Sequence, residues 1–417
     1  MRIGLLTQWF EPEPGPAALP GTLAHGLLSR GHEVSVVTGF PNYPTGHLAP
    51  GYRVRPRTVE DRSGVRVTRV ALYPSHADSI SRRVMNYGSF AASAASLGVA
   101  RAFRDIDVMW VNYSPVTVAV PMLVQHALRS TPSVVHVLDL WPDTLTATGF
   151  VPRGGAARLA VSIADRAARS MYTAAERVAY ISPGVGDVLA SRGVPRSKLR
   201  YAPMWADEST FGHERCPVVR GFGLEAGDVA ILYAGTLGRA QGLETLIEAC
   251  AALRASGLVC LVAGSGTEEQ RLRDLAAELG ADNVRFLGRL PSTEMPGLMA
   301  AVDAHFVALN DDPLARTTMP SKVQTILASS GAVVGSVTGD AADVIRDSGA
   351  GWTCSPGDVT ALTGALRAVM REGAAGLLAR GRAGRRYYDT HFAMDVGIDR
   401  IEQLLVEATR GSDVPCS

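Results

Sequence analysis

The sequence predicts an α/β protein built from two Rossmann-like domains that face each other across a cleft. Strand patterns alternate with helical patterns along the chain, and the alternation starts again after a stretch broken by glycine and proline at 204–227. Each half opens on a strand that is followed by a glycine-containing turn. This spacing is typical of βαβ units, in which helices cover both faces of a parallel sheet. A chain of 417 residues, 47% of them apolar, is long enough for two such cores.

Short apolar runs predict the strands and longer periodic stretches predict the helices. In the first half, strands are predicted at Arg2–Thr7, Glu33–Thr38, Val65–Val70, Asp107–Val111, Ser133–Leu138 and Arg177–Ile181, and helices at Ala17–Arg30, Ser81–Arg104 and Val116–Arg129. In the second half, strands are predicted at Ala230–Ala234, Leu258–Ala263, Val284–Leu287, Ala304–Leu309 and Ala332–Ser336. The predicted domains are 1–204 and 205–387, and a C-terminal helix at about 388–417 is expected to pack back on the first domain.

Composition narrows the class of protein. With 41 basic and 40 acidic residues the formal net charge is +1, whereas a nucleic-acid reader normally carries a basic stripe. No apolar run approaches the ~20 residues that span a bilayer, and the chain enters a strand directly without a signal peptide. The five cysteines are widely spaced and form no CxxC motif, which fits a reducing cytoplasm. We therefore expect a cytoplasmic protein without nucleic-acid partners or stable membrane insertion.

The most informative segment is Val229–Glu244, VAILYAGTLGRAQGLE, which predicts a buried strand, a glycine-rich turn and a helix starting near Gly242. Such a turn leaves backbone N–H groups free at a helix N-terminus, where the helix dipole favours an anion. Arg239 lies in the turn, and Lys322 follows in a Met-Pro-Ser-Lys segment as one of only two lysines. Together they indicate a phosphate or diphosphate site. The alternative is a surface arginine and a solvated lysine.

The ordered segments resemble glycosyltransferase family 4, which comprises retaining, nucleotide-sugar-dependent enzymes of the two-domain GT-B fold. The likeness is greatest to the branch of colanic-acid and O-antigen glycosyltransferases. It rests on stretches that occur in the family's order along nearly the whole chain: Thr38–Gly46 (TGFPNYPTG), Leu138–Asp143 (LDLWPD), Tyr233–Ala249, Asn283–Pro291 (NVRFLGRLP), Arg316–Lys322 (RTTMPSK) and Gly339–Ile345 (GDAADVI).

The resemblance implies an acceptor-side first domain and a second domain that binds the nucleotide sugar. Arg239 and Lys322 would clamp the donor diphosphate and act in catalysis. Asp139, at the end of a strand of the first domain, would be the third catalytic residue, near the sugar and the acceptor. The other implied donor-binding residues are Gly15 and Pro16 after the first strand, Gly238, Gly288, Arg289 and Leu290 near the nucleobase, Arg316, Ser321, and the helix start Gly339, Asp340, Ala341 and Ala342.

The chain also departs from the family. Many relatives carry two glutamates seven residues apart, one for the sugar and one for the ribose, where this chain has Arg316 and Gln324. The basic pair usual after the first strand of the second domain is replaced by Thr236 and Gln241. Pro16 stands where a second glycine is common. These changes leave the donor, UDP- or GDP-linked, open.

Several residues keep two interpretations. Asn42, Tyr43, Trp141 and Asp143 are candidate acceptor-binding residues, although Trp141 can equally close a core edge. Asp139 is either a sugar-binding carboxylate or one that backbone N–H groups satisfy. His136, inside an apolar strand, is better explained as a core histidine than as a base. Asp311 and Asp312 are better explained as solvated than as metal ligands, so neither a metal nor a cofactor is predicted.

The function predicted from these features is metal-independent, retaining transfer of a sugar to an acceptor hydroxyl or thiol. The Val84–Ala100 stretch is rich in alanine, serine and glycine and predicts a poor membrane-docking face. It favours a soluble small-molecule acceptor, as in natural-product biosynthesis. The alternatives are a lipid-linked acceptor in cell-surface polysaccharide biosynthesis, which would place the enzyme at the membrane, a degenerate GT-B binding partner, and a sugar-nucleotide epimerase.

Overall fold

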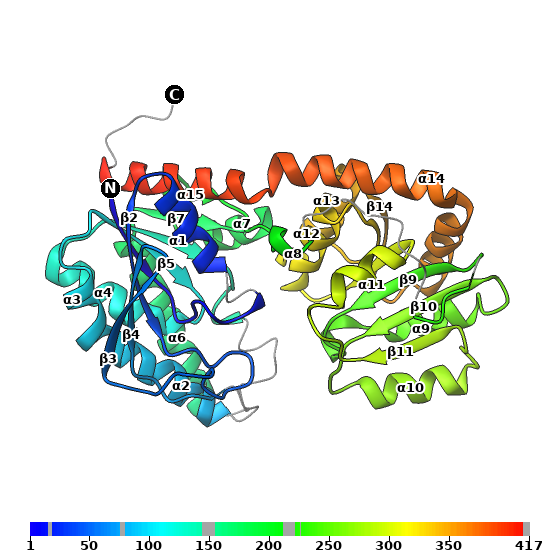
Figure 1. Ribbon diagram of the computed structural model, residues 1–417, viewed down its shortest axis with the longest axis horizontal. Coiled ribbons are helices and arrows are strands. Elements are labelled where there is room, and N and C mark those ends of the chain that lie inside the picture. The colour runs from blue at the N-terminus through cyan, green and yellow to red at the C-terminus, as the bar shows by residue number, and fades with distance from the viewer. Residues whose placement is uncertain (16–18, 76–79, 144–154, 212–221, 226, 412–417) are drawn as a thin grey trace. The chain divides into compact units, whose positions relative to one another are not determined.

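The computed structural model describes residues 1–15, 19–75, 80–143, 155–211, 222–225 and 227–411, and the chain divides into two units (Figure 1). Unit 1 comprises Met1–Pro203 and Gly397–Ser417, and unit 2 comprises Met204–Val396. The sequence prediction assigned Met204 to the first domain and expected 388–396 to pack on it, whereas both belong to unit 2. Each unit is a mainly parallel sheet with helices packed on it, so the predicted α/β class with two parallel-sheet domains is confirmed.

Unit 1 is an eight-stranded sheet in the order β3-β4-β2-β1-β5-β6-β7-β8. Its strands are β1 (Arg2–Leu6), β2 (Glu33–Gly39), β3 (Arg57–Arg62), β4 (Val65–Val70), β5 (Val108–Tyr113), β6 (Ser133–Val137), β7 (Arg177–Tyr180) and β8 (Leu199–Tyr201). Its helices are α1 (Leu19–Ser29), α2 (Ile80–Ser93), the π-helix η2 (Ala94–Val99), α3 (Ala100–Ala102), the 3-10 turn η3 (Val116–Val118), α4 (Ala119–Arg129), α6 (Gly155–Ala174), α7 (Pro183–Ser191) and the 3-10 turn η4 (Arg196–Lys198). All strand pairs are parallel except β3 with β4.

The central strands of unit 1 are apolar because they are covered on both faces. Every residue of β5 and of β6 is buried. The edge strand β3, with the sequence RTVEDR, alternates between half-buried and exposed residues. A polar edge strand of this kind carries no apolar run, and the sequence prediction missed it.

The C-terminal helix α15 (Met394–Thr409) is held to unit 1 by charged contacts. Arg30 on the α1–β2 connection donates to Asp399 at 2.6 Å, His32 lies 2.7 Å from Glu402, and Arg177 at the start of β7 donates to Glu407 at 2.9 Å. Buried residues of α15, among them Ile398, Ile401 and Leu405, add an apolar contact face. Figure 1 shows this helix beside α1.

Unit 2 is a six-stranded, wholly parallel sheet in the order β11-β10-β9-β12-β13-β14. Its strands are β9 (Val229–Ala234), β10 (Leu258–Ala263), β11 (Val284–Gly288), β12 (Ala304–Ala308), β13 (Ala332–Ser336) and β14 (Gly351–Cys354). Its helices are α8 (Glu208–Phe211), the 3-10 turn η5 (Arg239–Gln241), α9 (Glu244–Ala251), α10 (Glu269–Glu278), α11 (Met295–Ala301), the 3-10 turn η6 (Ala315–Thr317), α12 (Ser321–Ala328), α13 (Asp340–Asp347) and α14 (Val359–His391), which is interrupted at Gly373.

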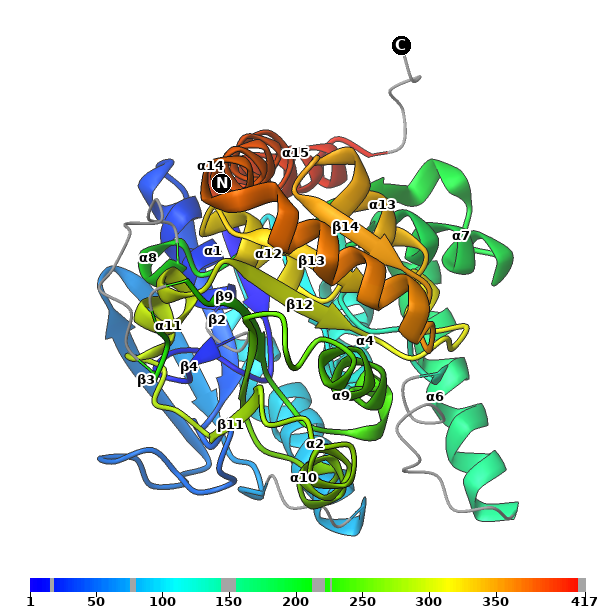
Figure 2. The same ribbon diagram turned by 90° about the vertical axis from the view of Figure 1, so that its right-hand side faces the viewer.

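Two apolar cores sandwich the sheet of unit 2, because successive side chains of a strand point to opposite faces. Ile231 and Tyr233 of β9 join the core beneath α9, α10 and the first part of α14. Ala230 and Leu232 join the core beneath α11, α12 and α13. Figure 2 shows α9 and α10 next to each other. The sheet is thus fixed from both sides, and its strand ends offer a rigid edge.

Candidate functional site

The predicted donor residues of unit 2 gather at one edge of its sheet. Parallel strands all end at the same edge, where ligands of open α/β sheets bind. Gly238 and Arg239 follow β9, Gly288, Arg289 and Leu290 end or follow β11, Arg316, Ser321 and Lys322 follow β12, and Gly339, Asp340, Ala341 and Ala342 follow β13. Segments up to about a hundred residues apart are therefore brought to one edge.

The loops after β9 and β10 run against each other with no room for side chains. A Cβ on Gly264 would lie 1.8 Å from the carbonyl oxygen of Gly235. Gly264 has φ +145° and Gly235 has φ +149°, values that residues with a side chain rarely adopt. The Gly264 N–H donates to Gly288 O at 2.8 Å, which joins β11 to the same edge. Bare backbone is thereby presented where a ligand can approach it closely.

Lys322 lies in this edge as a partly desolvated amine. It occupies the first turn of α12, and its Nζ donates to the Tyr233 hydroxyl at 3.0 Å and lies 4.3 Å above the Tyr233 ring. A Cβ on Gly235 would be 2.3 Å from Nζ, so the amine rests on the backbone at the end of β9. Burial lowers the pKa of Lys322 to about 8. No carboxylate of the described residues forms an ion pair with it, which leaves N–H donors for an anion.

Tyr233 connects this amine to the glycine-rich turn, and the sequence analysis missed that role. Its hydroxyl accepts from Lys322 and donates to the carbonyl oxygen of Thr236 at 2.7 Å. Burial raises the pKa of Tyr233, so the phenol stays protonated. The signal in the sequence is a tyrosine one residue before the end of an otherwise aliphatic strand.

Arg239 is exposed on the turn after β9. The turn is held by Asn310, whose side chain donates to the Arg239 carbonyl and whose N–H donates to Ala240 O at 2.8 Å. Gln241 accepts from the Gly238 N–H at 3.2 Å. At the two positions where relatives carry a basic pair, Thr236 and Gln241 thus organise the turn without adding charge.

Arg316 and Gln324, the positions of the family's two glutamates, have different surroundings. Arg316 forms a two-pronged ion pair with Asp311, with both contacts at 3.0 Å, and both side chains are exposed. Gln324 is buried and donates to the Met204 carbonyl at 2.6 Å. Neither position therefore supplies a carboxylate in this chain. Asp312 accepts from the Leu314 N–H at 2.7 Å.

Apart from the Asp340 side chain, the start of α13 can offer a ligand only backbone N–H groups. Ala341 and Ala342 are buried, so their predicted contribution must come through the main chain. Gly339 precedes them at φ +64°, and a Cβ there would lie 1.9 Å from Arg316 O. The loop after β12 is therefore packed on this helix start.

In unit 1, Asp139 lies just beyond the end of β6 and accepts from the Ser114 hydroxyl at 2.7 Å. Asp139 is exposed at the surface, yet desolvation of its carboxylate by the surrounding protein raises its pKa. The hydrogen bond from Ser114 partly opposes this shift. Burial raises the pKa of Tyr87, the charge of Arg83 opposes this shift, and the charge of Asp139 adds to it. Asp139 and Tyr87 on α2 are therefore close enough to interact electrostatically.

Three aromatic rings of unit 1 form a cluster from separate segments. The Trp9 ring, after β1, lies 6.1 Å from that of Tyr43 and 6.3 Å from that of Tyr87. All three residues are half-buried. Tyr43 was predicted at the acceptor site, whereas Trp9 and Tyr87 were not.

The other candidate acceptor residues have structural partners. Asn42 is buried, and its side chain donates to Phe40 O at 2.9 Å and accepts from Asn86 at 3.4 Å. Asp143 forms an ion pair with Arg192, which also donates to the Trp141 carbonyl at 3.0 Å. Gly15 is exposed at φ +68°. Pro16 lies outside the described residues.

His136 is fully buried in β6, where its Nε2 lies 2.7 Å from the Ala202 carbonyl. A carbonyl can only accept, so Nε2 carries the proton. Burial lowers the pKa of His136 to about 4, which keeps the ring neutral. The interpretation as a core histidine fits this environment.

Glu13 is a buried carboxylate that fixes two loops of unit 1, and the sequence analysis missed it. It accepts from the N–H groups of Phe10 at 3.0 Å, Asn42 at 2.8 Å and Tyr43 at 2.9 Å. Burial raises its pKa, while these bonds and the charge of Arg69 oppose the shift. Glu13 therefore ties the loop after β1 to the loop that carries Tyr43.

We expect Glu13→Ala to lower the free energy of unfolding by about 3 kcal/mol, because three buried N–H groups lose their acceptor. Glu13→Gln should cost less, since one side-chain oxygen can still accept from Asn42 and Tyr43. Urea unfolding measures both changes, with exposed Glu33→Ala as the control. A urea midpoint for Glu13→Ala equal to that of the control would show that Glu13 does not hold the two loops together.

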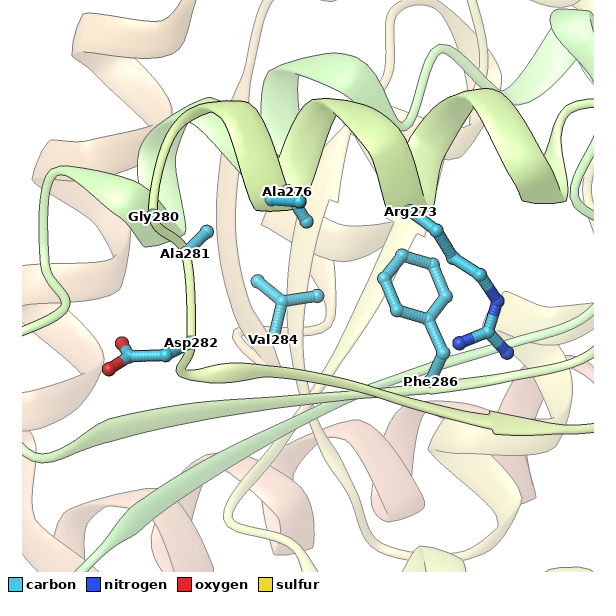
Figure 3. A pocket seen from close by; sticks show the side chains of 8 residues that line it. Arg273, Ala276, Gly280, Ala281, Asp282, Val284 and Phe286 are labelled. Atoms are coloured by element: carbon cyan, nitrogen blue, oxygen red, sulfur yellow. The ribbon is translucent and has the colours of Figure 1, made fainter.

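Two cavities are found among the described residues, and neither is lined by a residue predicted for the site. A cavity of about 410 Å³ lies between α10 and β11 and is lined by Arg273, whose guanidinium sits 4.6 Å from the Phe286 ring centre (Figure 3). Another, of about 450 Å³, is lined by Phe40, Tyr52, Arg53 and their neighbours in unit 1. Among the described residues there is no group of three or more His, Cys, Asp or Glu that could hold a metal ion.

Family models match both units. A model described as "Glycosyl transferase 4-like domain" matches residues 15–205, and one described as "Glycosyl transferases group 1" matches residues 220–384. Over 332 residues the chain is 28% identical to the "Putative colanic acid biosynthesis glycosyl transferase WcaI" of Escherichia coli (strain K12). That alignment covers 78% of this chain and 80% of the relative.

Solved structures share the fold. Sucrose-phosphate synthase from Thermosynechococcus elongatus aligns with a TM-score of 0.68 at 17% identity, covering 97% of this chain and 98% of that one. Anabaena Alr3699/HepE in complex with UDP also has a TM-score of 0.68, at 15% identity, with 97% of this chain and all of that one covered. These structural neighbours are GT-B glycosyltransferases, so the predicted fold is confirmed. The chain belongs to the glycosyltransferases that combine a 4-like domain with a group 1 domain, the family that the order of its motifs predicted.

Proposed function

We propose that this glycosyltransferase moves a sugar from a UDP- or GDP-linked donor to a sugar hydroxyl of a lipid-linked acceptor, with retention of configuration and without a metal. The observation that carries the donor half is Lys322, a desolvated amine on the bare backbone at the strand ends of unit 2. The structural neighbour HepE has been crystallised with UDP and with UDP-glucose. Those complexes support a nucleoside diphosphate donor for this chain.

The roles of these residues in catalysis follow from where charge develops during sugar transfer. As the nucleoside diphosphate leaves, negative charge grows on its β-phosphate oxygens while the sugar becomes oxocarbenium-like. Lys322 and the N–H groups at the start of α13 are the preorganised donors that would stabilise this charge, and the exposed Arg239 would join them by closing on the diphosphate. The acceptor attacks from the face that the leaving group departs from, and its proton passes to the departing phosphate. A protein base is then unnecessary.

The acceptor half rests on unit 1. Trp9, Tyr43 and Tyr87 form an aromatic cluster near Asp139. The C–H face of a sugar ring packs on aromatic rings, while a carboxylate accepts from its hydroxyls. The named role of WcaI in colanic acid biosynthesis agrees with a glycan acceptor.

The soluble small-molecule acceptor expected from the sequence loses its main support. That expectation rested on a poor docking face at Val84–Ala100. In the structure Val84 is 63% exposed and Met85 is 52% exposed, next to Arg82 and Arg83 on α2. We therefore place the lipid-linked acceptor first and keep the soluble hydroxyl or thiol acceptor as the competing outcome of the assay.

The assay offers UDP- and GDP-sugars with a polyprenyl-diphosphate-linked sugar, with the same sugar free in solution, and with simple thiols. We expect turnover only with the lipid-linked acceptor. Turnover confined to soluble acceptors would overturn the acceptor assignment. Release of a modified nucleotide sugar without any acceptor would indicate epimerisation, and nucleotide binding without any reaction would indicate a binding partner.

We also predict that chelation leaves turnover intact, because cationic side chains take the place of a metal at the diphosphate. Rates in excess EDTA should equal those in excess Mg²⁺. Loss of turnover in EDTA, restored by Mg²⁺ or Mn²⁺, would show that a metal is needed.

Binding of UDP should weaken above pH 8. Burial lowers the pKa of Lys322 to about 8 in the free protein, and a bound diphosphate would raise it again by stabilising the ammonium. Above pH 8 binding therefore takes up a proton, and affinity falls by about tenfold per pH unit until the pKa of the complex is reached. Isothermal titration calorimetry across this range measures the slope.

Lys322→Arg is the control for this pH dependence, because a guanidinium remains charged throughout. The variant should bind UDP with an affinity that does not change over the same range. An equal slope in both proteins would assign the titration to another group.

A further inference from the structure

Helices α2, α4 and α6 of unit 1 form one packed layer. Helix α4 contacts both α2 and α6 (Figure 1). Helix α4 connects the adjacent parallel strands β5 and β6, and α6 precedes β7, the next parallel neighbour. Right-handed crossovers between such strands place their helices on the same face of the sheet. The outward sides of these helices therefore form one continuous surface of unit 1.

This layer carries most of the strongly exposed apolar side chains of the described residues. They are Val84 and Met85 on α2, Val120 and Leu128 on α4, and Leu159 and Ile163 on α6. Leu128, Leu159 and Ile163 are each more than 60% exposed. The exposed large apolar residues elsewhere, Val54, Val59, Tyr73 and Leu279, reach 42% at most. Single exposed apolar residues need no explanation, but a group on one layer indicates an interaction site.

The same helices concentrate positive charge. Helices α2, α4 and α6 contain one acid, Asp165, and six arginines: Arg82, Arg83, Arg129, Arg158, Arg166 and Arg169. Asp165 is paired with Arg169 at 2.8 Å. The whole chain is nearly neutral, with 41 basic and 40 acidic residues. Positive charge is thus concentrated on the layer that exposes apolar side chains.

This combination fits a lipid surface better than a protein. The exposed apolar residues are aliphatic, whereas the energetic centres of protein interfaces are rich in tryptophan and tyrosine. Leu159 and Ile163 lie four residues apart and share a side of α6, with Arg158 and Arg166 flanking them. Apolar side chains between arginines are typical of helices that lie in the plane of a membrane interface, where the basic groups meet anionic headgroups.

We propose that the outer sides of α2, α4 and α6 form a docking surface for an anionic lipid bilayer. The surface would hold unit 1 at the membrane, where a lipid-linked acceptor resides. This role for the surface rests on the proposed function. Docking needs no spanning segment. Among the described residues no helix has the length and apolarity to cross a membrane.

The test measures vesicle binding of the full chain without any substrate. The protein should sediment with equimolar phosphatidylcholine–phosphatidylglycerol vesicles, not with phosphatidylcholine vesicles, and high salt should weaken the binding. The double variant Leu159→Ser/Ile163→Ser should bind at least about tenfold more weakly, because two exposed aliphatic side chains no longer enter the interface. Leu279→Ser, an exposed leucine of unit 2, is the matched control and should bind as the wild type does.

Absence of binding to anionic vesicles would overturn the proposal, as would equal binding by the double variant and the control. A concentration-dependent dimer that the double variant abolishes, in the absence of vesicle binding, would assign the surface to a second copy instead. Turnover on a detergent-dispersed acceptor separates the two proposals. If the wild type binds vesicles but uses no lipid-linked acceptor, docking stands and the acceptor assignment fails.

Discussion

Lys322→Ala is expected to lower turnover by about 100-fold or more while the fold persists. The amine faces charge that grows as the diphosphate leaves, and one lost donor of this kind costs about 10²–10³ in rate. Its setting strengthens the expectation, since the amine is partly desolvated and, among the described residues, contacts the neutral Tyr233 hydroxyl and ring but no carboxylate. Arg239→Ala should lower turnover to a similar extent if the exposed guanidinium closes on the same diphosphate.

Rate constants are to be compared at saturating donor, so that weaker ground-state binding is not mistaken for lost catalysis. The chain offers a matched control in Lys198→Ala, the other lysine, whose amine donates to backbone carbonyls of unit 1. Lys322→Arg should keep part of the activity, because a planar fork replaces a compact ammonium imperfectly at a close phosphate contact. Near-normal turnover in both Lys322→Ala and Arg239→Ala would show that other groups hold the diphosphate.

The placement of Arg239 and Lys322 at one sheet edge could be predicted because it depends on topology alone. Once β9 and β12 are recognised as parallel strands, the loops that follow them must share an edge. The partners of these residues could not be predicted in the same way. Tyr233 and Lys322 are 89 positions apart, and Asn310 and Arg239 are 71 apart. A local pattern does not encode which side chain fills such a contact.

The same distinction explains which helices and strands the sequence prediction missed or misplaced. The strands of the two sheet centres are apolar runs, so they were found within a residue or two. Strand β3 is polar because it is a sheet edge, and β8 and β14 are only a few residues long. The helix predicted at Ser81–Arg104 is divided by a π-helix at Ala94–Val99. A pattern that depends on burial identifies only what is buried.

Average composition and side-chain exposure give different predictions for the Val84–Ala100 stretch. Its alanine, serine and glycine content is low in hydrophobicity on average, which suggested a poor docking face. What matters for docking is which side chains point outward, and those include Val84 and Met85. The small residues Ala91, Ala94 and Gly98 are buried instead, where they allow close packing. An average over a helix cannot distinguish these two sides.

Gly264→Ala is expected to destabilise unit 2 by about 3 kcal/mol or more and to weaken UDP binding. A methyl group at this position would lie 1.8 Å from the carbonyl oxygen of Gly235, and backbone cannot swing aside as the end of a flexible side chain can. The φ of +145° adds strain for any residue with a Cβ. Relief requires the loops after β9 and β10 to separate. That movement would shift Gly235 away from the Lys322 amine that rests on it.

Gly297→Ala is the matched control, because Gly297 lies inside α11 with nothing within 4 Å of a new Cβ. Alanine in a helix is favoured over glycine by about 0.5–1 kcal/mol, so this variant should be as stable as the wild type or more so. Urea unfolding followed by tryptophan fluorescence measures the stability, and the thermal shift on adding UDP measures the donor edge. If Gly264→Ala unfolds at the wild-type midpoint and keeps the full UDP shift, the two loops do not meet backbone to backbone. The donor edge would then have to be formed differently, because Lys322 would no longer be held against the end of β9.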